Sequence, residues 1–178
     1  RFSSRRRLTR CQEVSWARIC VYETDLDNIN NKITKKSIES CFQKNNWSGC
    51  FANQEVGYYD IFALRANNWN NVDCFAEIYK DNINSFSYIQ EDFQMDYLFE
   101  KHVLKKMRKI KKDSEWIEVN SAFGGIGIYK YEDIKNNFYD LTPSKSEYEY
   151  ECEHVNFNNR IIENGGRLFI NPGFINSK

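Results

Sequence analysis

The sequence of 178 residues is poor in proline and glycine, with two and eight of them, and contains only two histidines. Such low counts exclude a collagen-like chain and a Pro/Gly-rich low-complexity chain. No apolar run approaches the roughly 18 residues of a membrane-spanning helix, so we expect no transmembrane segment. Net charge is also missing, because 25 Lys and Arg balance 25 Asp and Glu. We therefore expect neither a nucleic-acid partner nor an anionic membrane surface.

Apolar residues, by contrast, are plentiful: 41% of the chain is hydrophobic and 16% aromatic, which is enough for one core. We expect a single domain over residues 1–178.

The absence of Cys-x-x-Cys spacing argues against a zinc knuckle or ribbon. Several cysteines lie in apolar contexts, which favours reduced, buried thiols. No secretory signal is visible, so a cytoplasmic location is expected. The cysteines are Cys11, Cys20, Cys41, Cys50, Cys74 and Cys152.

Alternating strand and helix patterns predict an α/β fold with a mixed central sheet. Apolar runs rich in β-formers predict strands at 18–22, 49–53, 58–65, 116–119, 126–129 and 167–170. Helical spacing of apolar residues predicts helices at 29–44, 92–112 and 152–164. Two glycines at 165–166 should stop the last helix, and Asn171-Pro-Gly173 should close the last strand. Residues 141–149, with Pro143 and several charges, should form a loop.

A first candidate site is the acidic pair Asp25-Leu-Asp27, which directly follows the first predicted strand. Carboxylates two residues apart on an extended chain point the same way. At the carboxyl end of a strand, such a pair can hold a divalent cation, and the cation can hold a diphosphate. A solvated turn, or a cap for a helix that begins near Asn28, explains the same pattern.

A second candidate is His154, which stands among the carboxylates of Glu151-Cys-Glu-His154. It could be a third metal ligand, with Glu153 or Glu151 as a neighbouring base. Two carboxylates and one imidazole suit Mn²⁺ or Mg²⁺, whose remaining ligands would be phosphate and water. The alternative is an ordinary surface histidine flanked by acids.

A third candidate is the turn Asn120-Ser-Ala-Phe-Gly-Gly125, whose unhindered backbone amides allow close approach of a ligand. The same turn could simply join two strands. Aromatic side chains such as Tyr59 and Trp116 could stack on sugar faces, but each is equally explained as a packed side chain.

Taken in order, these motifs resemble GT-A-fold nucleotide-sugar glycosyltransferases of bacteria and giant viruses, distantly similar to capsule mannosyltransferases. The resemblance spans most of residues 18–176. It is carried by Asp25-Leu-Asp27, Tyr58-Tyr-Asp-Ile-Phe-Ala-Leu-Arg65, Val119-Asn-Ser-Ala-Phe-Gly-Gly-Ile-Gly-Ile-Tyr-Lys130, Cys152-Glu-His-Val155 and Phe169-Ile-Asn-Pro172. It implies a single GT-A-like (Rossmann-like) domain and metal-dependent transfer of a sugar from a nucleotide-sugar donor to a glycan or another hydroxyl acceptor.

The resemblance also implies roles for particular residues. Mn²⁺ or Mg²⁺ would be held by Asp25, Asp27 and His154. The base of an inverting reaction would be Glu153, with Asp60 behind it. The substrates would be bound by Tyr59, Arg65, Ser121, Gly124 and Gly125.

The sequence departs from this family in one respect. Only 24 residues precede Asp25, whereas GT-A enzymes usually place a nucleotide-binding β-α-β-α unit there. The chain opens on Arg1, and its basic residues 1–17 resemble the end of that unit, so we expect an N-terminally truncated domain or a separate N-terminal half. The alternatives are a non-catalytic sugar- or partner-binding remnant and a metal-dependent hydrolase that uses the same carboxylates.

Overall fold

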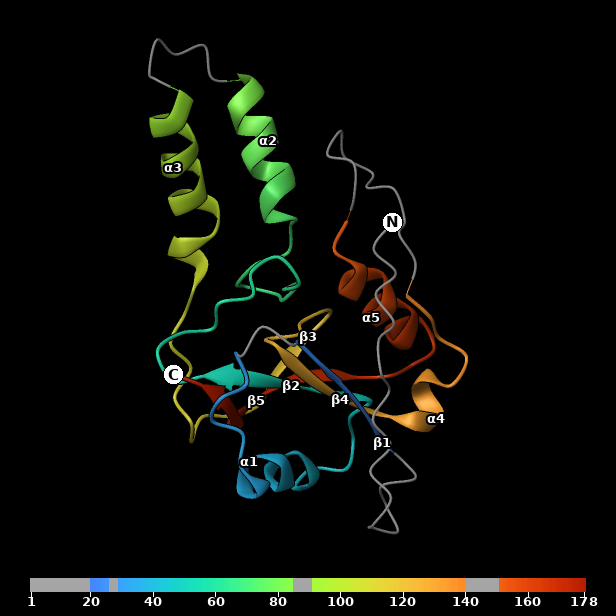
Figure 1. Ribbon diagram of the computed structural model, residues 1–178. Helices are drawn as coiled ribbons and strands as arrows, with labels where there is room; N and C mark the ends of the chain where they lie inside the picture. Colours follow the sequence, from blue (N-terminus) through green and yellow to red (C-terminus); the bar gives the residue numbers. More distant parts are fainter. Residues whose placement is uncertain (1–19, 26–28, 85–90, 140–150) are drawn as a thin grey trace, which may run out of the picture.

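The structure is a computed structural model that describes residues 20–25, 29–84, 91–139 and 151–178 (Figure 1). Their centre is a five-stranded sheet of order β1-β4-β2-β5-β3. Its strands are β1 (Cys20–Thr24), β2 (Gly49–Gln54), β3 (Ile117–Val119), β4 (Ile126–Lys130) and β5 (Leu168–Ser177). β1, β2 and β5 run in one direction, and β3 and β4 run in the other. The predicted α/β class with a mixed central sheet is confirmed.

The side chains of β2 alternate between two cores, because successive residues of a strand point to opposite faces. Cys50 and Ala52 belong to one core, which also holds Trp47 and Phe174. The short helix α1 (Lys35–Glu39) and the 3-10 turn η1 (Ser40–Phe42) cover this face of the sheet (Figure 1). A reciprocal pair of hydrogen bonds between Thr34 and the residue at 37 caps the start of α1.

The opposite face carries the larger core, which includes Phe51, Tyr129 and Leu168. Helix α5 (Glu153–Glu163) and the irregular segment 58–66 pack on this face, and the short helix α4 (Tyr131–Ile134) follows β4. The helices α2 (Cys74–Asn84) and α3 (Glu91–His102) lie beside each other and rise from the same face (Figure 1). A 3-10 turn, η2 (Leu104–Lys106), leads away from α3.

The predicted strand at 58–65 is wrong. This segment makes only isolated bridges, Tyr58 to Arg108 and Arg65 to Ser121, and turns between them. Its β-forming side chains are buried by packing rather than by strand pairing, since Tyr58, Ile61 and their neighbours lie in the larger core. The β-propensity of a residue reflects how well its side chain packs on a buried surface. A compact turn can offer such a surface as well as a strand can.

The helix predictions need three corrections. The helix predicted over 29–44 shrinks to α1 and η1, and the one predicted over 92–112 ends at His102, with η2 beyond it. Neither α4 nor α2 was predicted. The N-terminal amides of α2 are capped by Asp73, whose Oδ1 accepts hydrogen bonds from the N–H groups of Phe75 and Ala76.

The C-terminal predictions are confirmed in part. α5 ends as expected: Gly165 has φ +84°, and the N–H groups of Gly165 and Gly166 donate to Ile162 and Ile161. The predicted end of the last strand is wrong, because β5 continues through Pro172 as far as residue 177. The ladder between β2 and β5 shifts register there, so residues 171–174 form a bulge.

The five described cysteines are free thiols, and all but Cys20 are buried, which confirms the expectation for them. Burial raises the pKa of the Cys74 thiol to about 11. Cys11, Asp27, the basic residues 1–17 and the loop 141–149 lie outside the described residues. Among the helices in the described ranges, none is both long and apolar enough to cross a membrane.

Candidate functional site

Most of the candidate site residues from the sequence analysis lie at or near one edge of the sheet. Because β1, β2 and β5 are parallel, their carboxyl ends at Thr24, Gln54 and Ser177 share this edge. The turn 123–125 lies at the same edge, because it leads into the first residue of β4. In open α/β sheets, ligands bind outside the carboxyl ends of the strands.

A ladder of amide side chains joins the three strand ends. Gln54 Nε2 donates to Asn176 Oδ1 at 2.8 Å, and Asn176 Nδ2 donates to Asn30 Oδ1 at 2.7 Å. Asn30 Nδ2 in turn donates to the carbonyl oxygens of Gly125 and Asp25, at 2.9 and 3.2 Å. The ladder therefore fixes the backbone of Asp25 against the glycine turn.

The two glycines of the turn are required by geometry. Gly124 has φ +67° and Gly125 has φ +85°, conformations that L side chains rarely adopt. A Cβ on Gly124 would lie 2.8 Å from the carbonyl oxygen of Ala52. A Cβ on Gly125 would lie 3.0 Å from the hydroxyl oxygen of Tyr59, so the turn and this tyrosine are in close contact.

Asp60 holds the turn from the other side. Its Oδ2 accepts a hydrogen bond from the Gly124 N–H at 3.0 Å, and its Oδ1 accepts one from the Ala63 N–H at 3.1 Å. Burial raises the pKa of Asp60, and the charge of Glu153 raises it further, against the lowering effect of the two N–H donors. Glu153 is the first residue of α5 and is half-buried, so two carboxylates face the same region.

His154 sits in a fixed orientation next to this region. Its ring stacks on Phe123, with centroids 3.9 Å apart and an interplanar angle of 14°. Its Nδ1 lies 3.2 Å from the hydroxyl of Tyr139, which also contacts a carboxylate oxygen of Glu23. When the Tyr139 hydroxyl donates to that carboxylate, its oxygen accepts from His154 Nδ1–H. The lone pair of the neutral ring then falls on Nε2.

The expected metal centre is not assembled among the described residues, in which no group of three His, Cys, Asp or Glu side chains could hold a metal ion. Asp25 is exposed at the edge, and its backbone N–H donates to the Gly125 carbonyl at 3.0 Å. Its predicted companion Asp27 lies outside the described residues. Of the expected ligand set, the structure thus offers one carboxylate at this edge, and the Nδ1 of His154 is engaged by Tyr139.

Two residues that the resemblance assigns to substrate binding make hydrogen bonds within the chain. The Arg65 guanidinium donates to the carbonyls of Phe62 and Leu64 and to Asp73, at 2.8 to 3.2 Å. Ser121 is fully buried, and its Oγ accepts from Asn158 Nδ2 at 3.0 Å. Both residues support the segments that carry the site.

The residues that the sequence analysis missed are the amides and the phenol that orient the site. They are Asn30, Gln54, Tyr139, Asn158 and Asn176. Position gives one signal that could have found some of them: Gln54 and Asn176 fall at or near the last residues of strands, where polar side chains of parallel strands meet.

The amide ladder leads to a first testable prediction. Replacing Asn176, which is fully buried, by alanine removes two donated hydrogen bonds and one accepted bond. We expect the free energy of unfolding to fall by about 1–3 kcal/mol, the usual cost of leaving buried polar groups without partners. Urea denaturation measures it. The matched control Asn159→Ala, at an exposed position of α5, should change stability by less than about 0.5 kcal/mol. Equal effects would contradict a structural role for the ladder.

Comparison with known proteins finds no match, whether to a family model, to a curated protein or to a solved structure.

Proposed function

We propose that this protein is a metal-dependent glycosyltransferase of the GT-A (Rossmann-like) type, or the catalytic part of one. It would transfer a sugar from a nucleotide-sugar donor to a hydroxyl acceptor such as a glycan. One observation carries the proposal. Segments far apart in the sequence, which hold Asp25, the turn 123–125 and the carboxylates Asp60 and Glu153, meet at the carboxyl edge of the parallel strands.

The donor would lie along this edge. Asp25, which directly follows β1, would hold Mn²⁺ or Mg²⁺ together with Asp27. The cation would neutralise charge on the diphosphate leaving group. The glycine turn would orient the sugar through its backbone, because Gly124 and Gly125 carry no side chain that would keep a ligand away.

Two carboxylates would divide the remaining work. Both oxygens of Asp60 accept backbone N–H groups, so Asp60 is assigned to positioning the turn. Glu153 is half-buried beside it and would accept the proton of the acceptor hydroxyl in an inverting reaction. His154, held by Phe123 and Tyr139, would present Nε2 as a third metal ligand; ligating histidines commonly use the other ring nitrogen for such a fixing hydrogen bond.

Titration calorimetry with a panel of nucleoside diphosphates, in Mn²⁺ and then in EDTA, tests the proposal. We expect heat of binding only with the metal. The variant Asp25→Asn should weaken binding by about tenfold or more, because it removes a charge that would face the cation. Its thermal midpoint should stay within about 2 °C, since the replaced side chain is exposed.

The matched control is Asp113→Asn, an exposed aspartate on the loop after η2, which should leave binding unchanged. Absence of metal-dependent heat with every nucleoside diphosphate would reject the transferase and favour a non-catalytic remnant. Metal-dependent binding without release of sugar from any nucleotide-sugar, tested in parallel, would limit the function to binding.

A further inference from the structure

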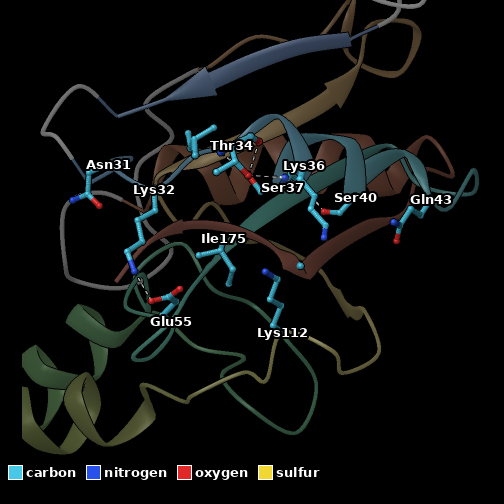
Figure 2. A pocket seen from close by; sticks show the side chains of 12 residues that line it. Asn31, Lys32, Thr34, Lys36, Ser37, Ser40, Gln43, Glu55, Lys112 and Ile175 are labelled. Carbon is cyan, nitrogen blue, oxygen red and sulfur yellow. Dashed lines mark hydrogen bonds and ion pairs between the residues drawn. The ribbon is translucent and has the colours of Figure 1, made fainter.

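A cavity of about 570 Å³ opens on the face of the sheet that α1 covers (Figure 2). Its lining comes from the turn before α1, from α1 and η1, from β5 and from two loops, one after β2 and the other after η2. Pockets of roughly 300–1,000 Å³ hold small molecules in many proteins, so the space suits a compact ligand.

The charges that line the cavity are unequal. Three lysines, Lys32, Lys36 and Lys112, line it with one carboxylate, Glu55. Lys32 Nζ lies 2.6 Å from Glu55 Oε2, so this pair is neutral. The same ion pair, with smaller effects of Lys112 and Lys178, lowers the pKa of Glu55 and keeps it ionised. Two positive charges are therefore left over in the cavity.

Lys36 and Lys112 are the source of this surplus. Within the described part of the chain neither makes an ion pair, whereas Lys35, next to Lys36, pairs with Glu39. Figure 2 shows the two side chains reaching toward one another from α1 and from the loop after η2. Both residues are exposed, so a ligand can reach their ammonium groups.

Three hydroxyls line the cavity: Thr34 Oγ1 accepts from the Ser37 N–H at 3.1 Å, and the other two donate within the chain. Ser37 Oγ donates to the Thr34 carbonyl at 2.8 Å, and Ser40 Oγ donates to the Ser37 carbonyl at 2.6 Å. Their hydrogens are thus engaged within the chain. Ile33 and Ile175 supply an apolar part of the lining. A ligand would therefore meet two free cations above a partly apolar surface.

We propose that this cavity binds a small molecule that carries a diphosphate or two phosphate groups, with Lys36 and Lys112 as the binding cations. Lysine binds phosphate as a compact point charge with three rotatable donors, so no fixed hydrogen-bonding frame is needed. The charge surplus of two matches an anion of two or more negative charges. The site lies on the side of the sheet covered by α1, and it needs no divalent metal, so it stands independently of the proposed glycosyl transfer.

Calorimetric titration with inorganic pyrophosphate in EDTA tests the site. EDTA removes any binding through a cation at Asp25, so a failed transferase would not affect the result. We expect saturable binding that is tighter than that of inorganic phosphate and weaker at high salt. The double variant Lys36→Ala/Lys112→Ala should bind about tenfold more weakly.

The matched control is Lys35→Ala/Lys111→Ala, which removes the same total charge from exposed neighbours that do not line the cavity. It should change affinity by less than about twofold, because screened charges outside the cavity contribute little. Equal weakening in the two double variants would reduce the effect to general surface charge and overturn the proposal. No binding to the wild-type chain at about 10 mM pyrophosphate would overturn it as well.

A structural readout places the ligand directly. Amide NMR shifts during the same titration should move at Gly173 and Ile175, which line the cavity, and stay fixed at Gly165, beyond the end of α5. The glutamine variant Lys36→Gln/Lys112→Gln, which keeps a polar but shorter side chain without the charge, should lose the shifts without a change in the melting temperature. Shifts that persist in this variant would contradict the assignment of the two lysines.

Discussion

Replacing Arg65 by methionine should lower the free energy of unfolding by about 3–5 kcal/mol. This is the usual cost of removing one partner of a buried ion pair, because the other charge stays buried without compensation. The Arg65 side chain is only 8% exposed, and its partner Asp73 is 12% exposed. Methionine fills similar volume but leaves the Asp73 carboxylate and the carbonyls of Phe62 and Leu64 without the guanidinium. Since domains are stable by only about 5–15 kcal/mol, this loss should be evident in urea or thermal unfolding.

An exposed pair of the same chemistry provides the control. Arg167 binds Glu118 through two hydrogen bonds of 2.8 Å, but the two side chains are 43% and 55% exposed. Arg167→Met should therefore cost only about 0–1 kcal/mol. If Arg65→Met were as mild as this control yet abolished nucleotide binding, Arg65 would be a substrate ligand, as the resemblance implies, rather than a structural residue.

The strands of the sheet were the most predictable part of the fold. β2, β3, β4 and the first half of β5 agree with their predicted positions to within a residue or two, because each is a short apolar run between turn residues. The segment 58–65 has the same composition but a different structure. What distinguishes it is its packing against the turn 120–122, a contact between distant segments that local propensity does not contain.

The sequence around α2 contains the usual signals of a helix start, which the sequence analysis did not use. Asp73 stands where an N-cap should, Glu77 follows in the first turn, and Cys74 and Ile78 are four apart on the buried side. The bulge in β5 carried no such signal. Asn171-Pro-Gly173 normally ends a strand, but here the Asn53 side chain donates to the Pro172 carbonyl and the ladder resumes beyond it.

The candidate site was predictable by residue type and only partly by role. Asp25, Gly124 and Asp60 were all chosen from motifs, and the structure brings their segments together. The asparagines that hold these segments could not be predicted as site residues. Asn is common throughout the chain, and a single asparagine belongs to no motif or repeating pattern. Their function depends on three strand ends meeting, which follows from the sheet order and not from local sequence.

The glycine turn permits a test in which strain and close approach are separated. Gly124→Ala should destabilise the protein by about 2–5 kcal/mol, because two costs add. A left-handed backbone costs an L residue about 1–2 kcal/mol, and overpacking costs about 1–3 kcal/mol. The new Cβ would lie 2.8 Å from the Ala52 carbonyl oxygen and 3.1 Å from the Tyr58 ring, neither of which can rotate away.

Gly165→Ala isolates the first of these costs. Gly165 has φ +84°, but nothing lies within 4 Å of the Cβ position, so only backbone strain of about 1 kcal/mol is expected. Urea denaturation of both variants gives the difference, which measures how tightly the turn is pressed against β2. Equal losses would show that Ala52 moves aside readily and that the turn is not fixed by close packing. A larger loss at Gly124, accompanied by weaker metal-dependent nucleotide binding in the folded fraction, would connect the packing of this turn to the ligand that the strand ends are proposed to hold.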